Sequence, residues 1–144
     1  MEEHIFRYFP SLSNEQRRQV LLLKEIYDEW NSRINVISRK DMDNFVIHHV
    51  LHSMSVAKVV SFSPGTRILD VGTGGGFPGI PLAILFPRSQ FTLLDSIEKK
   101  IRVVSSVAGY MITLLVAGLK REIMQAVHPG NFMVLSKPIL GALC

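Results

Sequence analysis

A glycine-rich turn constrains the fold of this chain more than any other feature. Residues Asp70–Gly79 read Asp-Val-Gly-Thr-Gly-Gly-Gly-Phe-Pro-Gly and overlap the end of the short apolar run Arg67–Val71. That run is typical of a buried strand, and residues 79–85 suit a short helix because proline is tolerated in a first helical turn. Glycines are needed where a strand turns tightly into a helix and where backbone approaches a ligand closely. The segment therefore predicts a strand-turn-helix unit with a ligand site at its turn.

Downstream of the turn, the chain predicts further elements of an α/β fold. Residues 90–95 predict a second strand, which we expect to run parallel to the strand at 67–71, and residues 98–108 predict a helix. The segments after Gly109 are harder to place. We expect a strand at 111–116, a helix at 119–127 and a last strand at 132–136.

The first 62 residues predict an all-helical unit. Ser13 and Gln16 have the spacing of a capping box, and apolar side chains recur behind them at steps of three and four. These side chains are Val20, Leu23, Tyr27, Trp30 and Ile34. Such a stripe is expected to pack on the protein's own core. A second helical stretch is expected at 41–60, and breakers at 63–65 then separate an N-terminal helical cap, residues 1–62, from an α/β unit, residues 63–144.

Composition limits the classes of protein to which the chain can belong. Its 144 residues suffice for one domain or for a small core with a helical attachment, and 47% of them are hydrophobic, which is normal globular usage. The single cysteine, Cys144, excludes an internal disulfide and a cysteine-based zinc site. No apolar run approaches the ~20 residues of a membrane span, and the first residues lack a signal-peptide pattern, so we expect a cytoplasmic protein.

Two acidic residues beside the turn indicate which ligand it holds. Gly74, Gly76 and Gly79 satisfy the dinucleotide-type pattern G-x-G-x-x-G, which by itself is a weak signal. Asp95 ends the next strand, 19 residues beyond Gly76, where a carboxylate accepts hydrogen bonds from a ribose diol. Asp70 lies near the place of a pyrophosphate, which disfavours NAD and favours S-adenosylmethionine, a cation without phosphate. In the structural alternative, Asp70 only caps amides of the turn.

Four segments point to a known family: Asn35–Ser38, His49–Ser53, Asp70–Pro81 and Phe91–Ser96. They resemble the GidB (RsmG) family of bacterial small-subunit ribosomal RNA methyltransferases over about residues 1–108, and the Phe-Pro-Gly-Ile-Pro extension after the glycines is the most specific element. The resemblance implies a Rossmann-like class I methyltransferase core that transfers a methyl group from S-adenosylmethionine to N7 of a guanine in ribosomal RNA. The candidate cofactor-binding residues are Asp70, Gly72, Gly74, Gly76, Phe77, Asp95 and Ser96.

The implied chemistry needs no catalytic acid or base. Guanine N7 carries a lone pair and no proton, so the transfer depends on alignment and on exclusion of water. We therefore name no catalytic residue. The alternative function is a non-catalytic protein that keeps the Rossmann-like scaffold with residual RNA or cofactor binding.

Basic residues near the expected ligand edge are candidate contacts to ribosomal RNA. The net charge of +4 arises in residues 63–144, which carry eight basic and four acidic side chains, whereas residues 1–62 carry eight of each. Such an excess suits a polyanionic partner, and a solvated basic surface is the alternative. The candidate RNA contacts are Arg39, Lys40, Lys99, Lys100 and Arg102.

Three histidines gather on the second helical stretch. His48 and His52 have the i, i+4 spacing of a metal-binding pair, but no carboxylate or cysteine completes a site convincingly. We therefore expect no metal and assign His48, His49 and His52 to capping, packing or contact with RNA phosphate.

From Gly109 onward the sequence departs from the GidB pattern. Residues 115–136 are instead similar to the late part of other class I methyltransferases, notably the ribosomal-protein-methylating PrmA type, and about one strand-helix unit is missing. The second and fourth strands of a doubly wound sheet lie on opposite sides of the first, so we expect an incomplete parallel sheet with an unusual crossover near residues 107–111. An exposed strand edge would invite a second copy of the chain to form a homodimer.

Overall fold

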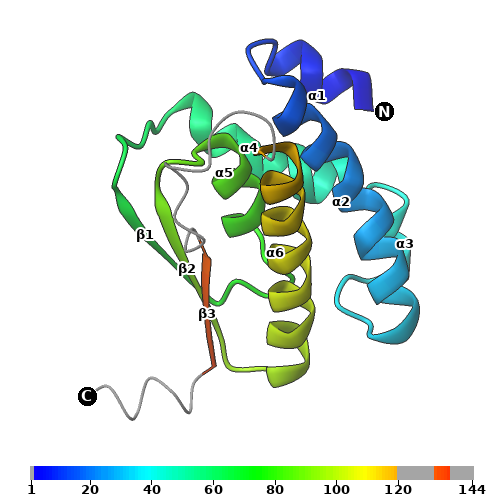
Figure 1. Ribbon diagram of the computed structural model, residues 1–144. Helices are drawn as coiled ribbons and strands as arrows, with labels where there is room; N and C mark the ends of the chain where they lie inside the picture. The colour runs from blue at the N-terminus through cyan, green and yellow to red at the C-terminus, as the bar shows by residue number, and fades with distance from the viewer. Residues whose placement is uncertain (1, 120–131, 137–144) are drawn as a thin grey trace.

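The computed structural model describes residues 2–119 and 132–136 of the chain, and Figure 1 shows their arrangement. In chain order the elements are α1 (Glu2–Tyr8), α2 (Asn14–Arg33), α3 (Arg39–Met42), the π-helix η1 (Val46–Leu51), α4 (His52–Ser55), the 3₁₀-helix η2 (Val56–Lys58), β1 (Arg67–Val71), α5 (Gly79–Leu85), β2 (Gln90–Asp95), α6 (Glu98–Leu119) and β3 (Phe132–Ser136). None of the helices in these two ranges is long and apolar enough to cross a membrane.

The start of α2 confirms the predicted capping box. Ser13 Oγ accepts a hydrogen bond from Gln16 N at 3.2 Å, and Ser13 N donates to Gln16 Oε1 at 2.9 Å. These bonds satisfy amides that a helix start otherwise leaves unpaired. The same glutamine donates from Nε2 to the carbonyl of Ile84 at 2.8 Å, which ties α2 to the last turn of α5.

The second helical stretch is broken, although the sequence predicts it as one unit at 41–60. It consists of four short helices of three kinds: the α-helices α3 and α4, the π-helix η1 and the 3₁₀-helix η2. Residues 2–62 nevertheless contain helices with short connections and no strand, which agrees with the prediction of helical structure.

Three parallel strands form the sheet in the order β1-β2-β3. The predicted strands at 67–71, 90–95 and 132–136 are confirmed, and Asp70 lies opposite Leu93 in the register of the first two. The position of the last strand corrects the sequence prediction. A doubly wound sheet would place this strand beside β1, on the side away from β2, whereas β3 pairs with β2. The physical reason is the path of α6, which begins near the carboxyl end of β2 and runs back beside that strand (Figure 1). Helix α6 contacts β3 as well as β2, so β3 takes the position in the sheet next to β2.

Helix α6 shows that the predicted strand at 111–116 is wrong. It has 22 residues and continues through Gly109, past the predicted end at residue 108. Buried Val104, Val107 and Met111 continue one apolar face across this glycine. A glycine inside a helix costs about 1 kcal/mol, and burial of a methionine gains about 1.5–3 kcal/mol, so the helix continues. Apart from Leu119, the predicted helix at 119–127 lies outside the described residues.

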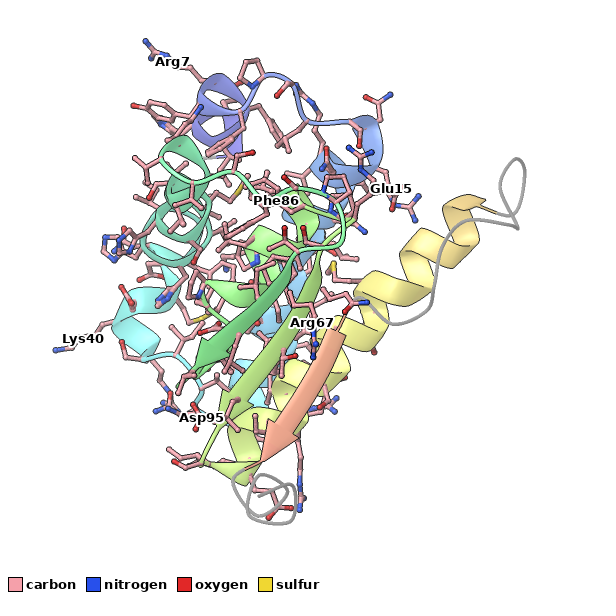
Figure 2. All side chains as sticks on the ribbon, turned by 90° about the vertical axis from the view of Figure 1, so that its left-hand side faces the viewer. Arg7, Glu15, Lys40, Arg67, Phe86 and Asp95 are labelled. Carbon is pink, nitrogen blue, oxygen red and sulfur yellow. The ribbon has the colours of Figure 1, made fainter. Side chains whose placement is uncertain are left out.

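Among the described residues, helices cover one face of the sheet and leave the other face exposed. Phe91 and Leu93 of β2 point into a continuous cluster of buried side chains to which α1, α2, η1, α5 and α6 contribute. On the opposite face, Leu69 and Val71 of β1 are 59% and 68% exposed. Figure 2 looks onto this open face, with the strands in front of the helices. In the part of the chain that the structure describes, β1 has a single strand neighbour, so its second edge is unpaired.

Candidate cofactor site

The glycine turn follows β1 at the carboxyl edge of the sheet. Gly72, Gly74 and Gly76 have φ angles of +75°, +59° and +96°, a region that side chains with a Cβ rarely adopt. The amides of Gly72 and Thr73 donate to the carbonyl of Leu94 at 2.7 and 3.0 Å, which joins the turn to the end of β2. At Gly79 a Cβ would lie 2.4 Å from Leu93 Cδ2, so glycine lets α5 start directly against the sheet. The Phe77–Pro78 peptide bond is cis.

Asp70 holds both ends of the turn. Its Oδ2 accepts hydrogen bonds from Thr73 Oγ1 at 2.7 Å and from Gly79 N at 3.0 Å. Desolvation raises the pKa of the Asp70 carboxyl, these two hydrogen bonds lower it, and the charge of Asp95 raises it further, with a net upward shift. The structural alternative from the sequence is thus observed at Asp70, while its role toward a cofactor stays a prediction.

The raised pKa of Asp70 predicts a specific pH dependence of stability. A carboxyl group whose pKa is higher in the folded than in the unfolded chain contributes stability at low pH, and this contribution is lost as the pH rises through the folded pKa. Asp70→Asn removes the charge and keeps one oxygen that can accept from both Thr73 and Gly79. Above pH ~4, the free energy of unfolding of the parent chain should therefore fall relative to that of Asp70→Asn. Urea denaturation across pH 4 to 8 measures the difference, and parallel curves for the two proteins would contradict the assignment.

Asp95 connects the ends of β1 and β2. Its carboxylate oxygens accept from Gly74 N and Ile97 N, both at 2.8 Å, and the residue is 8% exposed. The side chain therefore fixes the glycine turn to the loop after β2, and Ser96 next to it is exposed. Sequence reasoning placed Asp95 at this edge, but its bond to Gly74, 21 residues earlier, has no local signal.

A cluster of aromatic rings supports the turn from the helical cap. The ring centroid of Phe77 lies 5.1 Å from that of Tyr27, 5.7 Å from that of Phe45 and 5.3 Å from that of His49. Tyr27 is fully buried, its hydroxyl donates to the carbonyl of Gly75, and burial raises the pKa of this phenol. Sequence reasoning counted Tyr27 only as part of an apolar stripe. The one signal in the sequence was the tyrosine hydroxyl group, because a buried hydroxyl needs a hydrogen-bond partner.

The loop after α2 also touches the turn. Asn31 Oδ1 accepts from the amides of Val36 and Ile37, both at 2.9 Å, and Asn31 Nδ2 donates to the Ile37 carbonyl at 2.9 Å. A Cβ at Gly75 would lie 2.9 Å from Val36 Cγ1, so this loop packs closely on the glycines. The segment Asn35–Ser38, which the sequence singled out, therefore lies at the candidate site.

Two of the three clustered histidines share one carboxylate. His48 Nδ1 and His49 Nε2 each lie 2.6 Å from an oxygen of Asp41, and these hydrogen bonds hold the pKa of Asp41 below its usual range. His52 is exposed on α4. Among the described residues, no group of three or more potential ligands is arranged to hold a metal ion.

The candidate RNA contacts occupy two places. Lys99 and Arg102 are exposed on the first turns of α6, Lys100 beside them is half-buried, and Arg102 forms an ion pair with Glu98 at 2.7 Å. Arg39 and Lys40 are exposed on α3.

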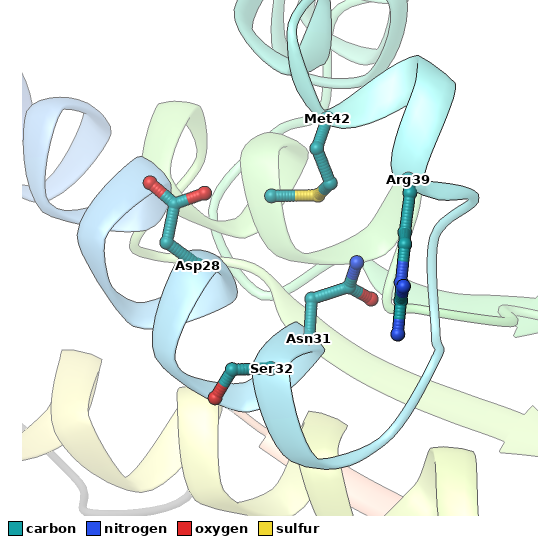
Figure 3. A pocket seen from close by; sticks show the side chains of 5 residues that line it. All are labelled: Asp28, Asn31, Ser32, Arg39 and Met42. Carbon is teal, nitrogen blue, oxygen red and sulfur yellow. The ribbon is translucent and has the colours of Figure 1, made fainter.

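Arg39 borders a shallow hollow of about 260 Å³ between α2 and α3. Asp28, Asn31, Ser32, Arg39 and Met42 line it. Figure 3 shows the Arg39 side chain running beside Asn31, the residue that fixes the loop against the glycine turn.

Comparison with known proteins finds a matching family model and similar relatives over most of the chain. The family model described as rRNA small subunit methyltransferase G matches residues 16–128, which extends 20 residues past the end expected from the sequence. A ribosomal RNA small subunit methyltransferase G from Bacteroides thetaiotaomicron is 60% identical over 107 residues, covering 74% of this chain and 52% of the relative. Its counterpart from Cytophaga hutchinsonii is 62% identical over 105 residues, covering 73% and 51%. The chain thus spans about half the length of the curated relatives it matches.

Proposed function

Because the chain belongs to the rRNA small subunit methyltransferase G (GidB) family, we propose that it is the cofactor-binding part of such an enzyme. In this proposal the cap and sheet form a Rossmann-like class I methyltransferase core with an incomplete sheet. The observation that carries the proposal is the hydrogen bond from Gly74 N to Asp95, which brings the glycine turn and the end of β2 together at one edge. The carboxyl edge of a parallel sheet is where α/β proteins bind ligands.

The residues at this edge fit S-adenosylmethionine. Each Asp95 oxygen accepts one backbone N–H and retains capacity for a second hydrogen bond, which suits a ribose diol. At Gly72 and Gly74 no described atom lies nearer than 4.0 Å to an added Cβ, so a ligand can lie against the backbone there, whereas Gly76 packs on Ile80 and Tyr27. Ser96 is exposed beside Asp95. Asp70 and Phe77 support the turn from behind. The negative charge of two carboxylates suits a cationic ligand better than a pyrophosphate.

The proposed reaction moves the methyl group of the sulfonium cofactor to N7 of a guanine in small-subunit ribosomal RNA. That nitrogen has a lone pair and no proton, so the protein's contribution is to align the reactants and exclude water. The proposed substrate also places the protein in the cytoplasm. No side chain of this chain is assigned as an acid or base.

Calorimetric titration with S-adenosylhomocysteine tests the proposed cofactor site. Saturable one-to-one binding is expected, and ligand at 100 times Kd should stabilise the fold by about 2.7 kcal/mol. Gly74→Val places a branched side chain at a φ of +59° in the turn and should abolish binding. Gly109→Ala, a glycine substitution inside α6 and outside the glycine turn, is the control and should bind normally. No binding by the parent chain at millimolar ligand would refute the site.

A non-catalytic scaffold is the second candidate function, and the sheet of only three strands among the described residues supports it. Both candidates assign RNA contact to Arg39, Lys40, Lys99, Lys100 and Arg102. Phosphate contacts of this kind make affinity fall with salt without choosing a sequence. Salt-sensitive binding to ribosomal RNA without transfer of a labelled methyl group would identify the scaffold, and transfer would identify the enzyme.

We also propose that a second copy of the chain covers the unpaired edge of β1. The support is the exposure of Leu69 and Val71 next to that edge, since open apolar strands favour pairing. Sedimentation should then show a dimer that Leu69→Lys weakens, because a charge would be buried in the contact. A strictly monomeric parent chain at high concentration would contradict this proposal.

A further inference from the structure

The π-helix η1 lets two adjacent histidines reach one carboxylate. A π-helix closes its hydrogen bonds from residue i to i+5, so each turn holds more residues and successive side chains diverge by a smaller angle than in an α-helix. His48 Nδ1 and His49 Nε2 accordingly lie 2.6 Å from the two different oxygens of Asp41. Such π-helical segments occur frequently at functional sites.

The two histidines differ in what their rings touch. The His49 ring lies 5.3 Å from the Phe77 centroid and 5.8 Å from that of Phe45, and its side chain is 23% exposed. The His48 side chain is 52% exposed, and no ring contact is found for it among the described residues. Asp41 therefore fixes one imidazole against the aromatic cluster and one at the surface.

Phe77 is the first side chain after Gly74, Gly75 and Gly76. Those glycines have no side chains of their own, so the turn is held by its hydrogen bonds, by neighbours such as Val36 that pack on its backbone, and by the contacts of Phe77. The amides of Gly76 and Phe77 both donate to the Thr73 carbonyl, at 2.9 and 3.0 Å, so the ring of Phe77 and the turn form one unit. A side chain that fixes this ring also fixes the turn.

We propose that His49 is a positioning residue for the glycine turn: Asp41 orients its imidazole, and the imidazole holds Phe77 and the turn in the conformation that binds the cofactor. The carboxylate of Asp41 on α3 bonds to the two histidines, so it acts on the turn through His49. The part of this inference that concerns the ligand rests on the proposed function, whereas the effect on the turn itself does not.

Hydrogen exchange of the turn amides tests the effect on the turn separately from the effect on ligand binding. His49→Ala and Asp41→Ala should speed exchange at Gly74, Gly76 and Phe77 about fivefold, the size expected for loss of one oriented ring contact. Amides of β2 serve as the internal reference, because a general loss of stability would speed their exchange equally. His48→Ala is the matched control, since it removes an equally short bond to Asp41 without a ring contact to the turn.

The same variants are then titrated with S-adenosylhomocysteine. Affinity should fall about fivefold in His49→Ala and Asp41→Ala and stay within about twofold in His48→Ala. Unchanged turn exchange in His49→Ala, or an equal effect of His48→Ala, would overturn the positioning role whether or not the cofactor binds. If the parent chain binds no ligand but His49→Ala and Asp41→Ala still speed exchange of the turn amides, the positioning role stands and the proposed function is refuted.

Discussion

Gly76→Ala is expected to lower the free energy of unfolding by about 3 kcal/mol or more, from backbone strain and overpacking together. The φ angle of +96° is strained for any residue with a Cβ, and the added carbon would lie 2.5 Å from Ile80 Cδ1 and 3.0 Å from the Tyr27 hydroxyl. Both neighbours are fully buried, so neither side chain has space into which to move. Urea denaturation of purified protein measures the loss.

Other glycines of the same chain separate the two causes. Gly65→Ala introduces backbone strain without a steric conflict, because φ is +81° and no atom of the described residues lies within 4 Å of the added carbon. It should cost about 1–2 kcal/mol. Gly79→Ala carries the steric conflict with Leu93 and Asp70 without a positive φ. If Gly76→Ala costs no more than Gly65→Ala, packing of the turn on the cap is not what selects glycine there.

Asp95→Ala should have the largest effect on the proposed cofactor site. It leaves the part-buried amides of Gly74 and Ile97 without their acceptor, which costs about 1 kcal/mol for each lost hydrogen bond. The turn also loses its connection to the end of β2, so affinity for S-adenosylhomocysteine should fall at least about tenfold, or about 1.4 kcal/mol. Calorimetry and denaturation on one preparation give both numbers.

Two companion variants make the Asp95 result specific. Asp95→Asn keeps one acceptor oxygen and should lose less of both stability and affinity. Glu98→Ala removes an exposed carboxylate three residues further, whose contact is an ion pair with Arg102, and should change neither by more than about 0.5 kcal/mol. If Glu98→Ala weakens binding as much as Asp95→Ala, the effect is one of general charge and not of the hydrogen bonds.

Sequence reasoning succeeded where the signal is local. The capping box at Ser13 and the glycine turn depend on neighbours within a few residues, and strands β1 and β2 are bounded by breakers. Each of these features lies where the sequence predicts it. The candidate residues Gly74 and Asp95, chosen from spacing, lie together because the carboxyl ends of two parallel strands meet at one sheet edge, and their role toward a cofactor stays a prediction.

Contacts between distant segments decided the features that the sequence could not predict. Helix α6 continues past Gly109 because Met111 is buried in the core, and no local pattern reports that burial. The position of β3 depends on the path of that helix. Tyr27 and Gly75 are 48 residues apart, and no spacing of residue types signals the π-helical pitch that brings two histidines to Asp41.

The shared core of cap and sheet has a consequence for how the chain acquires its structure. Helix α2 packs on α5 and α6, and its buried Tyr27 contacts Gly75 and Phe77, which are made later in synthesis. Such long sequence separations slow folding, since the entropy of closing a large loop is lost before the contacts form. Helix α2 therefore cannot complete its packing until α6 has been synthesised, so part of its apolar face is exposed in the nascent chain during that interval.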